Sequence, residues 1–224
     1  MTYTEKVLSY TPLVYYPMSE AAGAACVNVS ALGAVANGVY TGVTLGQPGI
    51  GDGGTAPYFD GTNDYATMPS DAVITTFNGQ EVTVSAWFKL DAGEWANGTF
   101  RMVVNLAADA NNYIYMRKRF ANDMAFEYKG GGVEDHVYHA MNPAAWTHVA
   151  LTASRTADEL KAYVSGGQVG ATQGTLGVHT NVLGTWYIGS VSAIPAQTWK
   201  GHIAHVTVFD SALPVESILD LATV

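Results

Sequence analysis

Hydrophobic and polar positions alternate along residues 81–89, whose sequence is EVTVSAWFK. In an extended strand successive side chains point to opposite faces, so this alternation separates the residues into two sets. One face carries Val82, Val84, Ala86 and Phe88, and the other carries Thr83, Ser85 and Trp87. Both sets suit a largely covered surface, and we therefore expect a central strand rather than an edge strand.

A turn is expected just before this strand, in the segment YFDGTNDYA at residues 58–66. Two short apolar runs flank a polar centre, a pattern that is typical of a tight β-turn between strands. Asp60 and Asn63 can hydrogen-bond nearby backbone amides, and Gly61 can adopt a positive φ without a Cβ clash. The segment therefore predicts two strands joined by a short turn.

Short apolar runs recur along the rest of the chain, separated by turn residues. They lie at residues 13–18, 39–45, 101–106, 112–117, 124–129, 136–140, 146–154, 160–164, 186–189 and 202–209. Helical periodicity is confined to residues 3–9 and to a stripe at residues 214–222 that begins with Pro214. This pattern predicts an all-β sandwich or jelly roll of one domain, with a short C-terminal helix.

Charge and composition exclude several classes of function. The 224-residue chain is 48% hydrophobic, carries a formal net charge of -9, and has only a local cationic cluster at residues 117–119. Nucleic-acid binding needs a concentrated positive surface, so we expect no nucleic-acid partner. An anionic membrane surface would repel the chain, and no apolar run approaches the roughly 20 residues that span a bilayer. We therefore expect no membrane insertion.

The cysteine content and the N-terminal residues indicate the compartment of synthesis. Cys26 is the only cysteine, so no intrachain disulfide can form. The opening residues MTYTEK lack the basic and apolar regions of a signal peptide. We expect a protein without a signal peptide that is made in a reducing cytoplasm.

Carboxylates at glycosidase spacing are not found along any of the expected strands. A glycosidase needs two carboxylates that project into one cleft. Glu134 and Asp135 are sequence neighbours, as are Asp158 and Glu159, and neighbours on a strand point to opposite faces. The sequence therefore predicts no catalytic residues and a protein that is not an enzyme.

Aromatic residues are the candidates for ligand binding. Trp95 lies in the polar loop DAGEWANG at residues 91–98, where it suits a sugar-stacking platform or a subunit contact. Tyr113, Tyr115 and Arg117 share one face of a strand, which suits a concave binding sheet. The alternative is that these are ordinary half-buried strand residues. Trp87 and Trp146 are assigned to the core.

Several motifs, in this order along the chain, carry a family resemblance. They are PLVYYPMSEAAG, NGVYTGVTLGQPG, YFDGTNDYA, VTVSAWFKL, WTHVALTAS with LKAYVSGGQVG, WYIGS and GHIAHVTVFDSAL. The series resembles the laminin-G-like, concanavalin A-like jelly-roll superfamily. The resemblance implies a jelly-roll sandwich of two antiparallel sheets over residues 12–224. The first segments also resemble versions of the domain found in bacteriophage structural and tail-associated proteins.

The resemblance leaves the function open, because the superfamily includes non-catalytic carbohydrate-binding modules, glycoside hydrolases and polysaccharide lyases. Our first hypothesis is a non-catalytic structural or decoration protein of a phage particle with weak adhesion to cell-surface glycans. It would be assembled in the host cytoplasm, reside in the virion, and contact other virion proteins or copies of itself. The alternatives are a carbohydrate-binding module or lectin and, less favoured, a glycoside hydrolase or polysaccharide lyase.

Calcium is the one metal that the resemblance raises. Some relatives bind a structural calcium through an acidic residue in a G-x-I-D pattern of the last strand, and here Ala204 occupies the acidic position. The remaining candidate ligands are Glu20, Asn28 and Asp60. Calcium takes six to eight oxygen ligands, so the missing carboxylate argues against the site. We expect no cofactor.

The N-terminal segment, residues 1–11, has no evident strand partner. It carries Tyr3, Val7, Leu8 and Tyr10, which would form an apolar patch if they were exposed. Apolar patches tend to mark interfaces. We therefore predict that residues 1–11 attach the domain of residues 12–224 to neighbouring copies or to a particle surface.

Overall fold

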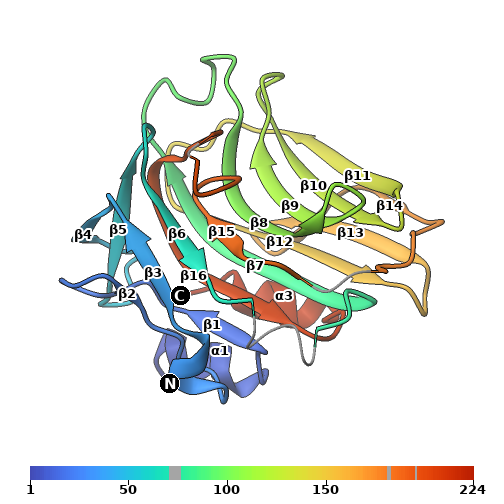
Figure 1. Ribbon diagram of the computed structural model, residues 1–224, viewed down its shortest axis with the longest axis horizontal. Helices are drawn as coiled ribbons and strands as arrows, with labels where there is room; N and C mark the ends of the chain where they lie inside the picture. The colour runs from blue at the N-terminus through green and yellow to red at the C-terminus, as the bar shows by residue number, and fades with distance from the viewer. Residues whose placement is uncertain (71–76, 181–182, 195) are drawn as a thin grey trace.

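The computed structural model describes residues 1–70, 77–180, 183–194 and 196–224 as a sandwich of two antiparallel sheets (Figure 1). Sheet A runs in spatial order through β14 (Gly167–Gln173), β13 (Glu159–Val164), β12 (Thr147–Ser154), β7 (Glu81–Leu90), β16 (Lys200–Phe209), β5 (Thr55–Asp60) and β4 (Thr44–Pro48), and β1 (Val14–Tyr16) also pairs with β16. Sheet B runs through β11 (Val133–Ala140), β10 (Asp123–Gly130), β9 (Asn112–Lys118), β8 (Arg101–Asp109), β15 (Trp186–Ile188), β6 (Tyr65–Met68), β3 (Gly38–Thr41) and β2 (Ala25–Cys26). The helices are α1 (Tyr3–Ser9), the 3-10 turn η1 (Gly33–Ala36) and α3 (Val215–Leu221). The predicted all-β jelly roll with a C-terminal helix is confirmed.

Strand β7 is central, as its alternation predicted. It pairs with β12 on one side and with β16 on the other. Val84 and Phe88 are fully buried in the core between the two sheets. Trp87, on the opposite face of the strand, is 8% exposed because other parts of the chain cover it. Both faces of β7 are therefore packed.

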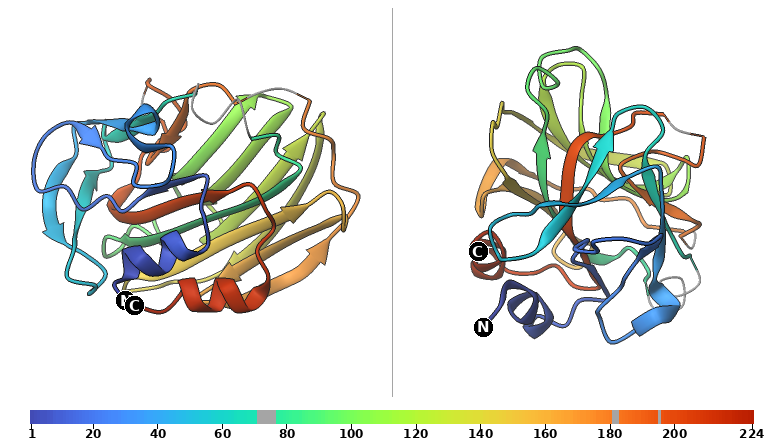
Figure 2. Two further views of the ribbon diagram at one scale, coloured as in Figure 1. Left: turned by 90° about the horizontal axis from the view of Figure 1, so that it is seen from below. Right: turned by 90° about the vertical axis from the view of Figure 1, so that its left-hand side faces the viewer.

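The α-helices α1 and α3 lie on the outer face of sheet A (Figure 2). Helix α3 packs Ile218 against Ala150 and Tyr163 of that sheet. Helix α1 packs Tyr3 and Val7 into a second cluster on the same face, together with Trp87. Within the described residues, no helix lies over the outer face of sheet B. The two outer faces of the sandwich therefore differ in how much of their surface is covered.

The turn at residues 60–64 was predicted to join two strands, but those strands do not pair with each other. β5 belongs to sheet A and β6 belongs to sheet B, so the turn carries the chain from one layer to the other. Asp60 accepts the backbone N–H of Thr62, and Gly61 has a φ of +82°, as the turn chemistry predicted. The stretch around residues 39–45 crosses between the layers in the same way, so it forms β3 and β4 rather than one bulged strand.

The expectation of an exposed apolar N-terminal patch is wrong. Tyr3 and Val7 are 6% and 1% exposed. The hydroxyl of Tyr3 accepts the indole N–H of Trp87 at 2.8 Å and donates to the carbonyl of Leu221 at 2.6 Å. Lys6 reaches the C-terminal end of α3, where it donates to the carbonyl of Asp220. The apolar side of α1 is thus covered by the domain itself, because sheet A and α3 supply the partners that the sequence did not reveal.

The helices of the described residues are all too short, or too polar, to cross a lipid bilayer.

Candidate functional site

On the outer face of sheet B, strand register determines which side chains are neighbours. Asn105 of β8 lies opposite Tyr115 of β9, which lies opposite Glu127 of β10. The next row contains Tyr113 beside Lys129. Directly opposed residues in an antiparallel pair share one face and have neighbouring Cβ atoms. The structure therefore brings together groups from consecutive strands into one surface, which we call the β9 face.

Two tyrosines form the centre of the β9 face. The rings of Tyr113 and Tyr115 are stacked, with centroids 4.0 Å apart and planes 9° apart. The guanidinium of Arg117 lies 5.6 Å from the ring centroid of Tyr115 and 5.1 Å from that of Phe100. Such cation–π contacts hold a planar group against aromatic rings. The expectation that Tyr113, Tyr115 and Arg117 share one face is thus met by the geometry, and their role in binding stays a prediction.

Ion pairs balance the charge of the β9 face and its margin. Three pairs link neighbouring side chains there: Arg117 with Glu127 at 2.9 Å, Arg119 with Asp123 at 2.7 Å, and Lys129 with Glu134 at 3.8 Å. Each cation has its own carboxylate, so the surface carries little net charge. A surface of this kind offers many hydrogen-bonding groups without the field that attracts a strongly charged ligand.

Glu127 is the most buried charged group of the β9 face, with a side chain that is 1% exposed. Burial raises the pKa of its carboxyl group, and the positive charge and hydrogen bond of Arg117 oppose that shift. Burial also raises the pKa of the Tyr113 hydroxyl, which donates a 2.6 Å hydrogen bond to Glu134. Among the described residues, Asn105 Oδ1 and Arg117 Nε are buried without a hydrogen-bond partner.

Sequence reasoning missed Asn105 and Glu127 as members of this face. Alternation along residues 123–129 places Glu127 and Lys129 on one side of a strand, which is a signal that could have been used. That pattern does not say which strand lies alongside, because register between strands depends on the whole sheet. The pairing of β8, β9 and β10 is what unites these residues.

Trp95 is not the exposed platform that its polar loop suggested. Its side chain is 4% exposed, its ring lies parallel to that of Phe88 at 6.2 Å, and its indole N–H donates to the carbonyl of Asn122 at 2.9 Å. The loop folds inward because Glu94 pairs with Arg101 and, at 2.9 Å, with Lys200. Trp95 is therefore part of the core and lies apart from the β9 face.

Trp95 also borders a cavity of about 420 Å³. Lys89, Asp91, Asn142 and His202 also line this cavity. Asp91 accepts the hydroxyl of Tyr58 at 2.8 Å, and burial lowers the pKa of His202. A ligand-binding role for Trp95 stays a prediction.

The three candidate calcium ligands bond to groups of their own loops or nearby strands. Glu20 accepts the backbone N–H of Val27 and the hydroxyl of Tyr40. Asn28 Oδ1 accepts the backbone N–H of Tyr15, and Asp60 caps its own turn. In the part of the chain that the structure describes, no three His, Cys, Asp or Glu side chains gather as a metal site would require. Calcium takes six to eight oxygen ligands, and the absence of a bound calcium stays a prediction.

The neighbouring carboxylates of the sequence point apart, as expected. Glu134 of β11 meets Tyr113 and Lys129 on the β9 face. Asp135 lies opposite Tyr128 in the strand pairing, on the other side of the sheet. Residues that alternate along a strand cannot act on one substrate from the same side. These two carboxylates therefore do not form the closely spaced pair of a retaining glycosidase.

The fold and the sequence together define the family. The chain belongs to the concanavalin A-like lectin/glucanases superfamily, whose laminin-G-type family model matches residues 60–219. The predicted membership is thus confirmed. No curated protein sequence matches the chain.

Solved structures with the same fold include receptor-binding domains of botulinum neurotoxins. The serotype D ligand-binding domain in complex with N-acetylneuraminic acid is similar with a TM-score of 0.76 and 13% identity over 96% of this chain and 51% of that one. The receptor-binding domain of the mosaic serotype C/D has a TM-score of 0.75 and 13% identity over 95% and 51%. Trypanosoma rangeli sialidase in complex with sialic acid has a TM-score of 0.68 and 13% identity over 93% and 32%. The chain thus spans about half of the toxin domains and a third of the sialidase, and the likeness shows the fold.

Proposed function

We propose that this protein is a non-catalytic glycan-binding domain that holds a neutral glycan on the β9 face. The observation that carries the proposal is the stacked pair of Tyr113 and Tyr115, set among ion-paired side chains on a sheet surface that no described helix covers. Binding sites for small ligands combine aromatic surface with a few well-placed polar groups. The β9 face has both.

Each part of the face has a role in this proposal. A sugar ring has an apolar side formed by its C–H groups, which packs on an aromatic ring such as that of Tyr115. The half-buried guanidinium of Arg117 supplies N–H donors for sugar hydroxyl groups, and the buried carboxylate of Glu127 holds that guanidinium in place. Because the cations are paired with carboxylates, we expect a neutral glycan rather than a sialylated one.

The comparisons lend support of a general kind. The superfamily is described by its lectins and glucanases, and one neighbouring structure, a botulinum neurotoxin domain, holds N-acetylneuraminic acid. These proteins are distant from this chain, so their ligands suggest a class of molecule and no particular sugar. The β9 face, not the likeness, is the basis for assigning the site here.

We also propose a setting for the domain, a bacteriophage particle on which it is displayed as a structural or decoration protein. The support is the resemblance of the segments PLVYYPMSEAAG and NGVYTGVTLGQPG to phage versions of the fold. Its partners would be other virion proteins or copies of itself. The test is whether the protein co-purifies with virions through a density gradient; free protein at the top of the gradient would contradict the setting without touching the glycan site.

A glycan array tests the binding function. We expect the native protein to retain neutral oligosaccharides and a Tyr115→Ala variant to lose them. An array that retains nothing would contradict the proposal. A polysaccharide degradation assay on the same glycans tests the non-catalytic part, and the appearance of shortened products would show that the domain is a hydrolase or lyase instead.

A further inference from the structure

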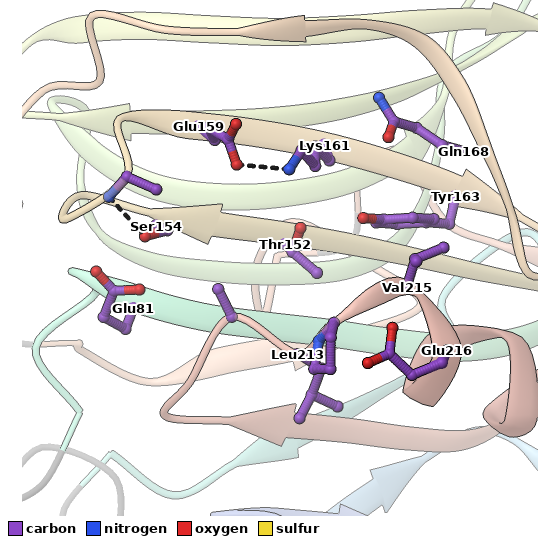
Figure 3. A pocket seen from close by; sticks show the side chains of 13 residues that line it. Glu81, Thr152, Ser154, Glu159, Lys161, Tyr163, Gln168, Leu213, Val215 and Glu216 are labelled. Atoms are coloured by element: carbon purple, nitrogen blue, oxygen red, sulfur yellow. Dashed lines mark hydrogen bonds and ion pairs between the residues drawn. The ribbon is translucent and has the colours of Figure 1, made fainter.

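A separate cavity of about 450 Å³ lies on the outer face of sheet A, on the other side of the sandwich from the β9 face (Figure 3). Its floor is formed by β12 and β13, and its wall is formed by residues 212–216, which lead into α3. In the strand pairing, Thr152 lies opposite Lys161 and Ser154 lies opposite Glu159, so the floor is a regular part of the sheet. The cavity remains because α3 covers only part of this face.

Two largely buried residues on the cavity floor carry hydroxyl groups that have no partner among the described residues. Thr152 and Tyr163 are 4% and 3% exposed, and neither hydroxyl has a hydrogen-bond partner among the residues that the structure describes. Figure 3 shows the Tyr163 ring lying along the cavity, with its hydroxyl directed toward Thr152. Both residues line the cavity, so their hydroxyls are available to polar atoms of a ligand or of water there.

Carboxylates give the cavity a negative charge. Glu81, Glu159 and Glu216 line it, and Lys161 is the one cation among its lining residues. The ammonium of Lys161 is already held by the carboxylate of Glu159. Glu216 has no ion-pair or hydrogen-bond partner within the described part of the chain. The surplus of carboxylates disfavours an anion and favours a positively charged ligand.

The wall of the cavity is apolar and fits an aliphatic chain. Leu213, Pro214 and Val215 form it, and Val215 is 52% exposed. An alkyl stem that packs on this wall would remove apolar surface from water, as the stems of lysine side chains commonly do. The cavity thus combines a charged and hydroxylated floor with an apolar wall.

We propose that this cavity binds a primary ammonium group carried on an aliphatic chain. An ammonium group has three N–H donors, and the hydroxyls of Thr152 and Tyr163 together with the carboxylate of Glu216 supply three oxygen acceptors. The aliphatic chain lies along Leu213 and Val215. The ligand is either a free diamine or a lysine side chain of another polypeptide. The site is independent of the β9 face, since the two lie on different sheets.

Isothermal titration calorimetry with two probes tests the site and separates the two sources. The probes are 1,5-diaminopentane, which represents a free amine, and Nα-acetyl-lysine N-methylamide, which represents a peptide lysine. We expect at least one to bind, and the tighter probe identifies the source. The Nε-acetylated form of the lysine probe has lost its charge, so it should not bind. N-acetylneuraminic acid, an anion, should not bind at this cavity either.

Two isosteric variants locate the binding. Glu216→Gln removes one charge and Tyr163→Phe removes one hydroxyl, and each should weaken binding about tenfold or more, as expected for a hydrogen bond to a charged group. Glu20→Gln makes the same charge change away from the cavity and should leave the affinity unchanged. Glu216 is exposed, so its variant carries the test even if Tyr163→Phe fails to fold.

The proposal is overturned if neither amine binds, if the acetylated probe binds as well as the charged one, or if Glu216→Gln binds as tightly as the native protein. None of these outcomes bears on the glycan array, because the array reports on the β9 face. Loss of glycan binding with amine binding intact would, in the same way, contradict the proposed function alone.

Discussion

The ring of Tyr113 lies flat against the ring of Tyr115, with 4.0 Å between their centroids, on strand β9, whose Arg117 forms an ion pair with Glu127 of the neighbouring strand β10. Two residues apart on β9, the tyrosines point to the same side of the sheet. Tyr113 is 9% exposed and Tyr115 is half-buried, so the stacked pair offers the ring of Tyr115 on a side of the sheet that no described helix covers. The account of function rests on this surface, whereas the other predictions test how the sandwich holds it in place.

The first prediction concerns Trp95. Because its indole is buried against Phe88, we expect Trp95→Ala to lower the free energy of unfolding by about 3–5 kcal/mol, the usual range for emptying an aromatic site. Urea denaturation measures the change. Phe120→Ala is the matched control, because Phe120 is 58% exposed and should cost far less. Equal losses in the two variants would mean that the loop of residues 91–98 does not pack as described.

The second prediction concerns the attachment of α1. Tyr3→Phe leaves the indole N–H of Trp87 and the carbonyl of Leu221 without a partner, which should cost about 1–3 kcal/mol of unfolding free energy. Deleting residues 2–10 should cost more, because Val7 is also buried. Thermal denaturation measures both. A deletion variant that is as stable as the full chain would show that α1 is a detachable segment, as the sequence suggested.

Some of the fold could be read from the sequence, and the limits have identifiable causes. Alternation in residues 81–89 predicted β7 correctly because both faces of that strand are packed. Packing on both faces constrains the residue type at every position of the strand. The segment at residues 58–66 predicted two strands but not that they enter different sheets, because a turn sequence records its own backbone and not the partners of its flanking strands.

The candidate site shows the same division. The shared face of Tyr113, Tyr115 and Arg117 follows from strand alternation alone, and the structure agrees. The burial of Trp95 depends on Glu94, which pairs with Lys200 across 106 positions of the chain. No local pattern encodes such a contact. A polar loop therefore looked exposed in the sequence, although long-range ion pairs fold it over the core.

The third prediction concerns pH. His148 is fully buried, and burial, together with the charge of His205, lowers its pKa from 6.5 to about 3. The unfolded chain therefore binds a proton between these values that the folded chain does not. The contribution of His148 to the free energy of unfolding should be fully present above pH 6.5. It should be lost as the pH drops toward 3.

Urea midpoints measured between pH 7.5 and 4 test this dependence. His148→Gln should flatten the slope in that range, because the variant has no proton to take up on unfolding. His136 is exposed on sheet B, and His136→Gln is the matched control, for which we expect the native slope. An unchanged slope in His148→Gln would show that other groups account for the loss of stability in acid.

The fourth prediction concerns calcium. Ala204 is fully buried and offers no carboxylate, and Glu20, Asn28 and Asp60 are occupied by hydrogen bonds of the fold. A ligand stabilises a protein only by binding its folded state, so a chelator should leave the melting temperature unchanged. Differential scanning fluorimetry with and without EDTA measures this. A marked drop in EDTA that added calcium reverses would reveal a site built from other oxygens.

The most direct test of the central claim is the affinity of the glycan selected on the array, measured by titration calorimetry for the native protein and two variants. Tyr115→Ala removes one ring of the stacked pair from the β9 face. Tyr10→Ala removes a half-buried tyrosine at the end of α1, whose hydroxyl donates to Asp220 of α3. We expect Tyr115→Ala to weaken binding about tenfold or more, as the loss of a central aromatic contact does, and Tyr10→Ala to leave it unchanged. Equal affinity in Tyr115→Ala and the native protein would contradict the claim that the β9 face binds glycans.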